Sequence, residues 1–479
     1  MNKFLKKYNS FSKQAKAAIW FFAASFIQKG ISTISTPIFT RLLSTEEFGQ
    51  YNVFNSWLGI ITVFVTLNLF YGVYEQGLIK FESDRNNFMS SLQGLECLLI
   101  IISLLIYTLL RKKINLITNL NSIQMYSMFL IMWSNAVYNF WAAGQRVVYK
   151  YKKLFFLSII AAICQPILCI VLIRAFENKV TARILGIAIV NILSYTAFFF
   201  IQISKGKFYK KKYWIYAFTF NIPLIPHYLS QTILISSDRI MIEKIDSSAS
   251  AGIYSLAYSI AMLMTIFNTA LNQTLGPWTF QKIKEGKIDN ISGVSYKCMF
   301  GIGVLNLMLI AFAPELVSIF APISYHEAIY VIPPIAISTI LLFAYDQFGK
   351  FEFYYEKTQL IALATAISAV MNIVLNYIGI RIWGYIAAGY TTLICYLLYA
   401  MFHFAVMNRI CKERLHIRNP YNWKLLLLGL GMLILCSGVL VLSYKVLLIR
   451  IFLIGLLVLI LFLKRNAILS AIKFLEEYK

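Results

Sequence analysis

A lysine lies near the middle of a stretch that is otherwise long and apolar enough to cross a bilayer. Lys29 falls about 18 Å from one end of residues 17–40 and about 16 Å from the other, so its side chain does not easily reach either interface. A lysine at the centre of a spanning helix costs on the order of 2.5–3.5 kcal/mol on insertion scales. We therefore expect Lys29 to line a water-filled cavity or a pathway, or to belong to a paired site.

The polar residues around Lys29 recur at helical spacing. Residues three or four positions apart lie on one face of a helix. The set that follows this spacing comprises Ser25, Gln28, Lys29, Ser32 and Thr36. The large apolar residues of the stretch fall largely on other faces, so the pattern predicts a helix with one hydrated face.

The composition is typical of a membrane protein. The chain of 479 residues is 59% hydrophobic and 13% charged, whereas soluble domains carry about 25% charged residues. Apolar runs predict about fourteen transmembrane helices, with no soluble domain between them. These runs lie near residues 17–40, 52–74, 89–110, 121–143, 154–174, 182–203, 213–236, 253–275, 291–313, 328–348, 358–379, 383–407, 424–444 and 447–463. We predict an all-α polytopic membrane protein.

Lysine and arginine are distributed unevenly between alternate loops. If the N-terminus is cytoplasmic, the cytoplasmic loops carry more than twice as many basic residues as the opposite loops, as the positive-inside rule requires. One loop, Arg111 to Lys113, departs from this distribution. We predict that both termini are cytoplasmic. The net charge of +24 then serves orientation and contact with anionic headgroups, and we expect no nucleic-acid partner.

The sequence offers no motif for catalysis or metal binding. Its seven cysteines lie in predicted helices or in a cytoplasmic loop, where no extracellular disulfide is expected. It matches neither HExxH nor a nucleotide-binding glycine loop nor a paired-cysteine metal site. We therefore expect no catalytic residue, no bound metal and no cofactor other than a coupling ion, H⁺ or Na⁺.

The helix pattern repeats after 203 residues. This shift places the first six predicted helices on the next six without gaps, and Gly49 and Tyr51 fall on Gly252 and Tyr254. An offset of an even number of helices gives both halves the same orientation, as in transporters that bind substrate between two repeats. The predicted domains are residues 1–204 and 205–410, each a six-helix bundle, and residues 411–479 with two further helices and a cytoplasmic tail.

Three segments resemble one family of bacterial transporters. They are Pro37 to Tyr51, then Ser237-Asp238-Arg239-Ile240 with Gly252-Ile253-Tyr254, and then Asn372 to Gly389. In these segments the chain resembles the O-antigen and capsule-type polysaccharide flippases of the multidrug/oligosaccharidyl-lipid/polysaccharide exporter superfamily.

The resemblance implies two pseudo-symmetric six-helix bundles around a central cavity in the bacterial cytoplasmic membrane. It also implies transfer of an undecaprenyl-pyrophosphate-linked oligosaccharide from the inner to the outer leaflet by alternating access. The expected partners are this lipid-linked glycan, membrane lipids, a polysaccharide polymerase and a chain-length regulator.

Such a substrate needs cations for its phosphates and neutral donors for its sugars. We expect Lys29 to bind the anion first, followed by Arg239, which falls on Thr36 under the repeat shift, and by Arg41. A structural ion pair or an anchor at the helix end is the alternative for each cation. The neutral candidates, for which helix packing is the alternative, are Gln28, Ser32, Thr66, Gln231, Asn268, Thr269 and Asn272.

A second set of residues could serve coupling or gating. Its charged and titratable members could carry a proton, pair with a neighbour or reach the interface, and its prolines could bend a helix. The set comprises Glu96, Pro223, Pro226, His227, Asp238, Lys297 and Asp346.

Other functions remain open at this stage. A multidrug antiporter of the same superfamily would favour acidic residues in its cavity, and a peptidoglycan-precursor flippase would share the phosphate chemistry. A membrane polysaccharide polymerase or ligase would need a large external loop, which the predicted helix pattern lacks. A passive structural component would not explain the polar face around Lys29.

Overall fold

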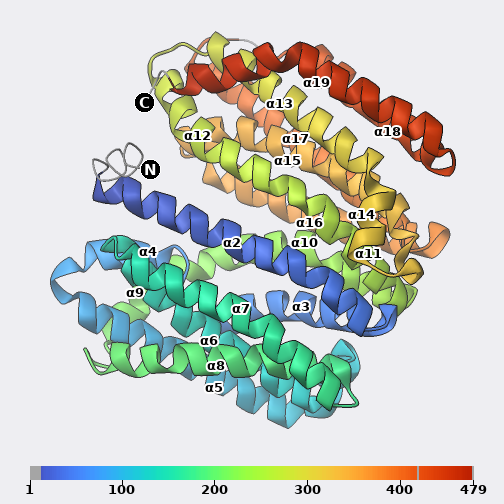
Figure 1. Ribbon diagram of the computed structural model, residues 1–479. Helices are drawn as coiled ribbons and strands as arrows, with labels where there is room; N and C mark the ends of the chain where they lie inside the picture. Colours follow the sequence, from blue (N-terminus) through green and yellow to red (C-terminus); the bar gives the residue numbers. More distant parts are fainter. Residues whose placement is uncertain (1–11, 418–419, 477–479) are drawn as a thin grey trace, which may run out of the picture. The chain divides into compact units, whose positions relative to one another are not determined.

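The chain is helical throughout the part that the structure describes. A computed structural model describes residues 12–417 and 420–476, and these residues form helices joined by turns and short loops, with no strand among them (Figure 1). A helix satisfies its backbone hydrogen bonds within one segment, as a chain dissolved in lipid requires. The predicted all-α class is confirmed. The N-terminal lysines among residues 1–11 and the last three residues lie outside the described ranges.

Nine helical segments of the described residues are long and apolar enough to cross a membrane. They are Glu82–Thr118, Tyr151–Ala175, Lys179–Ile203, Ser248–Lys284, Asn290–Ala311, Ala328–Tyr354, Gln359–Trp383, Ala387–Arg414 and Trp423–Lys445. The helix that carries Lys29, α2 (Lys13–Leu42), is not among them, although it is 30 residues long. The chain is a multi-pass membrane protein, and the number of about fourteen spans remains a prediction.

The chain forms two compact units that divide between Thr232 and Ile233. The helices of the first unit are α2 (Lys13–Leu42), α3 (Thr45–Thr66), α4 (Val73–Lys80), α5 (Arg85–Thr118), α6 (Ser122–Val147), α7 (Tyr151–Ala175), α8 (Lys179–Ile203) and α9 (Lys211–Asn221). Those of the second unit are α11 (Ser248–Ala261), α12 (Thr265–Lys284), α13 (Asp289–Ala311), α14 (Ala313–Phe320), α15 (Ala328–Tyr354), α16 (Thr358–Trp383), α17 (Ala387–Arg414), α18 (Trp423–Leu442) and α19 (Leu447–Glu476). Helix α10 (Ile225–Ile245) crosses the division.

This division differs from the predicted domain boundaries at residues 204/205 and 410/411. Helix α9 packs on α4 and α5 of the first unit, and the Trp214 indole donates a hydrogen bond to the Ser91 carbonyl at 2.8 Å. Helices α18 and α19 pack on α13 and thus belong to the second unit. The segment that follows the predicted span at residues 182–203, including α9, therefore belongs to the first unit.

Helix α3 begins and ends earlier than the predicted span at residues 52–74. A capping box starts it, because the Ser44 hydroxyl accepts from the Glu47 amide and the Glu47 carboxylate accepts from the Ser44 amide. It ends at Leu67 and Asn68, whose φ angles of 51° and 48° lie in the left-handed region. Hydropathy alone detects neither signal, so the residues after Thr66 form a turn where a span was predicted.

Two predicted spans contain a break in the helix. Pro223 lies in a short 3₁₀ segment, Ile222–Leu224, between α9 and α10, and Pro226 lies in the first turn of α10. Proline lacks a backbone donor, which explains why a continuous α-helix stops here. A second 3₁₀ segment, Met262–Met264, separates α11 from α12.

Helix α15 forms the core of the second unit. It packs against α11, α12, α13 and α17, and most of its residues are buried. A helix that is apolar on all sides is expected to be surrounded by other helices. Polar residues on α15 are therefore held inside the unit.

Candidate functional site

The polar face of α2 lies in the first unit, where α2 packs on α7. Its hydroxyl groups donate to carbonyls of their own helix: Ser35 to Ile31 at 2.7 Å and Thr36 to Ser32 at 3.0 Å. These bonds satisfy each hydroxyl donor without a partner from another helix and leave oxygen lone pairs for a ligand.

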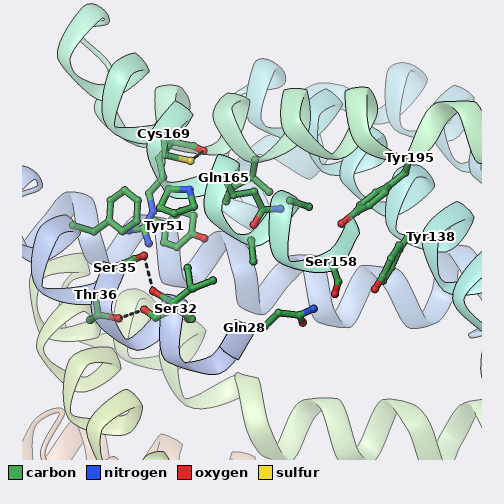
Figure 2. A pocket seen from close by; sticks show the side chains of 17 residues that line it. Gln28, Ser32, Ser35, Thr36, Tyr51, Tyr138, Ser158, Gln165, Cys169 and Tyr195 are labelled. Atoms are coloured by element: carbon green, nitrogen blue, oxygen red, sulfur yellow. Dashed lines mark hydrogen bonds between the residues drawn. The ribbon is translucent and has the colours of Figure 1, made fainter. Parts of the chain in front are cut away.

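This face forms one wall of a cavity of about 310 Å³ (Figure 2). Helices α2, α3, α6, α7 and α8 line it. Its polar lining comprises Gln28, Ser32, Ser35, Thr36, Tyr51, Tyr138, Ser158, Gln165, Arg183 and Tyr195. Gln28 and Ser32, two predicted site residues, thus lie together in a polar cavity.

Arg183 on α8 carries the charge in this lining. Its side chain lies between two rings, 3.9 Å from the centroid of Phe39 and 3.5 Å from that of Tyr51, and the residue is 8% exposed. Aromatic faces stabilise a guanidinium in such a position. The described lining of the cavity includes no acidic residue.

Aromatic and amide groups complete the cavity. The rings of Tyr138 and Tyr195 are 4.6 Å apart, and Figure 2 shows them side by side at the end that Ser158 also occupies. The Gln165 amide donates to Asn191 at 2.6 Å. Hydroxyl, amide and aromatic groups are the side chains that bind sugar rings through hydrogen bonds and stacking.

Lys29 lies on the same helix but not in the lining of this cavity. Its side chain is exposed, and none of the ion pairs among the described residues involves it. Arg41, also exposed, donates to the Pro37 carbonyl at 2.9 Å near the end of α2. The prediction that Lys29 and Arg239 line one central cavity remains a prediction.

Asp238 belongs to a buried hydrogen-bond network in the second unit. Its carboxylate accepts from Tyr254 at 2.6 Å, from Asn376 at 2.6 Å and from Thr392 at 3.0 Å. These donors come from α11, α16 and α17. The adjacent Arg239 points to a different neighbour, since its guanidinium lies 4.3 Å from the centroid of the Tyr258 ring.

A polar groove of about 480 Å³ brings four predicted residues together in the second unit. Asn268, Thr269 and Asn272 on α12 and Asp346 on α15 line it. Asn272 donates to Asp346 at 2.6 Å. Lys350, which is 7% exposed, donates to Asn272 at 3.1 Å. Within the described ranges, no group of three or more His, Cys, Asp or Glu side chains is arranged to hold a metal ion.

The other predicted residues lie apart from these two sites. Thr66 is buried and donates to the Thr62 carbonyl at 2.8 Å, as a packing residue would. Gln231 and Lys297 are exposed, and His227 is partly buried beside Tyr228.

Glu96 does not reach the surface, although it lies near the predicted end of a span. It is 2% exposed, and its two carboxylate oxygens are buried without a hydrogen-bond partner among the described residues. Snorkelling therefore does not account for its position.

Sequence reasoning missed Arg183, Tyr195 and Gln165. Arg183 lies at the edge of an apolar run, where a basic residue is ordinary. A signal was nevertheless present, because Arg183 lies inside a predicted span together with other polar residues. The rings that enclose it come from two other helices and become adjacent only on folding.

Comparisons with known proteins agree with this architecture. A family model described as "Polysaccharide biosynthesis protein" matches residues 15–283, more than half of the chain. An uncharacterized membrane protein of Haemophilus influenzae is 24% identical over 375 residues, which cover 72% of this chain and 84% of that protein.

Two solved structures share the fold. A structure of the lipid II flippase MurJ superposes with a TM-score of 0.68 at 14% identity, covering 94% of this chain and 99% of that one. An inward-facing multidrug transporter of the MATE family superposes with a TM-score of 0.61 at 13% identity, and the match covers 81% of this chain and 95% of that transporter. Both similarities concern the fold.

Proposed function

Because the chain belongs to the polysaccharide biosynthesis protein family and has the fold of its transporter superfamily, we propose that it is a flippase for lipid-linked oligosaccharides. It moves undecaprenyl-pyrophosphate-linked repeat units from the inner to the outer leaflet of the bacterial cytoplasmic membrane by alternating access. The units then serve surface polysaccharide assembly by a polymerase and a chain-length regulator. Both termini face the cytoplasm.

The cavity of the first unit is the observation that supports this substrate. The lipid tail of such a molecule stays in the bilayer, whereas its sugars and phosphates lose their water unless the protein replaces it. The cavity offers hydroxyl groups, amides, two adjacent tyrosine rings and the Arg183 guanidinium. A volume of about 310 Å³ suits a small part of the glycan at a time.

Lys29 supplies the anion site in this proposal. Its exposed ammonium lies one residue from Gln28, which lines the cavity. An ammonium or guanidinium binds phosphate oxygens through charge-assisted hydrogen bonds. Arg239 is the corresponding candidate of the second unit.

Flipping is tested with the purified protein in liposomes that contain a fluorescent undecaprenyl-pyrophosphate oligosaccharide, and an external lectin reports its arrival at the outer leaflet. Lys29→Ala and Arg183→Gln are expected to lower the rate at least about tenfold, because a charge-assisted hydrogen bond contributes about 1.5–3 kcal/mol. Lys29→Arg keeps the charge and retains part of the rate. Lys152→Ala, an exposed lysine at the start of α7, is the matched control.

Two results would contradict the proposal. Equal rates for Lys29→Ala, Arg183→Gln and wild type would remove both cations from the mechanism. Transport of a peptidoglycan precursor or of an organic cation, without transport of the oligosaccharide lipid, would favour the other functions of the superfamily.

A further inference from the structure

Glu352 on α15 and His403 on α17 form a buried pair inside the second unit. Glu352 Oε1 and His403 Nδ1 are 2.6 Å apart, and the two side chains are 0% and 1% exposed. The rings of Tyr345 and Tyr399 lie 5.4 Å and 4.5 Å from the imidazole. Neither residue lines the cavity of the first unit or belongs to the proposed anion site.

Each of the two side chains has a second polar atom that makes no hydrogen bond among the described residues. Glu352 Oε2 and His403 Nε2 are both buried and have no hydrogen-bond partner among the described residues. Native proteins rarely leave such atoms unsatisfied, and each case calls for an explanation. A site that binds and releases a proton explains the ring nitrogen, because Nε2 is a position that a proton occupies in one state and leaves in the other, while the Glu352 carboxylate stays beside it as the counter-charge.

Polar side chains of α15 lie along the helix between the groove and the pair. Asp346, which lines the groove, follows directly after Tyr345, whose ring lies 5.4 Å from the His403 ring. One helical turn further along α15, Lys350 donates to Gln347 at 2.7 Å and to Asn272 at 3.1 Å. The charged residues of α15 therefore reach from the groove to the pair within the same unit.

The charges of this cluster favour binding of one proton. When Asp346 and Glu352 are ionised, Lys350 is charged and His403 is neutral, the negative charges exceed the positive charge by one. A proton on the imidazole brings the sum to zero, and a buried cluster without net charge is the less costly state.

The groups around the cluster come from five helices, α12, α13, α15, α16 and α17. The titratable and charged ones are Tyr345, Asp346 and Lys350 on α15, Tyr399 on α17 and Cys298 on α13. Helices α12 and α16 contribute the neutral side chains of Asn272 and Thr365.

We propose that Glu352 and His403 are the proton-binding site that couples this transporter to a pH gradient, which rests on the proposed function. A proton from water in the groove passes Asp346 and forms an N–H bond on the His403 ring, so that the pair becomes an imidazolium and a carboxylate. Release breaks the same bond and returns the proton to water. The step consumes no other reactant.

The protonation state is measured without substrate, on the full-length protein with ¹⁵N-labelled histidine in lipid nanodiscs. The chain has four histidines, and His403→Gln identifies the signal of this ring. Spectra are recorded from about pH 5 to 8, and in wild type both ring nitrogens are expected to be found protonated, as in the charged form. In Glu352→Gln the ring is expected to be neutral at the same pH, and Glu356→Gln, which changes an exposed glutamate nearby, should leave it charged.

A ring that stays neutral across this range in wild type, or stays charged in Glu352→Gln, would overturn the proposal. Since a buried variant can fail to fold, Asp346→Asn is measured in parallel. It leaves the pair intact and is expected to slow proton exchange between His403 and water. An unchanged exchange rate would remove Asp346 from the route.

Coupling is measured in the flipping assay with an imposed pH gradient. Wild type and His326→Gln, an exposed histidine control, are expected to respond to the gradient, whereas Glu352→Gln and His403→Gln lose the response. An identical response of all four proteins, or none in wild type, would overturn the coupling. If wild type flips no oligosaccharide at all, the proposed function fails, and the histidine spectra still decide the proton site.

Discussion

Two buried charged side chains, one in each unit, are held by partners from several helices. Arg183 lies between the rings of Phe39 and Tyr51, and Asp238 accepts three hydrogen bonds. Such partners offset the cost of burying a charge, and removing one member leaves the others with the full desolvation penalty.

Asp238→Ala is expected to lower the free energy of unfolding by about 3 kcal/mol. The substitution leaves the donors of Tyr254, Asn376 and Thr392 buried without their acceptor. Asp238→Asn keeps one acceptor oxygen and should cost less. Thermal and chemical unfolding in detergent measure the change, with Asp246→Ala, at an exposed aspartate, as control. Equal stability of Asp238→Ala and Asp246→Ala would show that the network is not stabilising.

At the level of the element, α2 combines a polar face with an apolar one. On the polar face, the Ser35 and Thr36 hydroxyls donate to carbonyls of the same helix. Ser32 lines the cavity, whereas Ile34, two residues later, lies outside the lining and is 72% exposed. A hydrated face and a lipid face on one helix should therefore differ in their access to water.

This difference is tested with single cysteines in a variant that lacks the seven native ones. Ser32→Cys is expected to react with a membrane-impermeant maleimide, because the reactive thiolate forms only in contact with water. Ile34→Cys is the matched control and should react much more slowly. If Ser32→Cys reacts from neither side of the membrane, or no faster than Ile34→Cys, the hydrated face is absent.

At the level of the whole molecule, charge asymmetry predicts the orientation in the membrane. The exception at Arg111 to Lys113 has a structural counterpart, since α5 continues through these residues to Thr118 and carries them on exposed positions. Three basic residues at the end of one helix are fewer than the excess of lysine and arginine in the predicted cytoplasmic loops, so the predicted orientation is kept.

Reporter fusions test this orientation. Green fluorescent protein fused after Lys479 should fluoresce, because it folds in the cytoplasm, and alkaline phosphatase at the same point should be inactive. Alkaline phosphatase inserted between α5 and α6, next to Asn119, should be active outside. The reverse pattern would invert the topology and exchange the proposed inner and outer leaflets.

The positions of the helices and the polar face of α2 could be predicted because both are local properties. A run of apolar residues and a period of 3.6 residues need no knowledge of neighbouring helices. Gln28 and Ser32 were thus predicted for a hydrated site, and both line the cavity. Helix ends were less predictable where capping decided them, as at Ser44 and Leu67.

Composition, periodicity and short motifs are sufficient to establish the membrane class, the family and the course of most helices. The stacking of Arg183 between Phe39 and Tyr51 and the contact of Glu352 with His403 follow from helix packing and could not be predicted. Such pairings depend on how each helix rotates about its axis when it packs. That rotation is set by contacts between residues far apart in the chain.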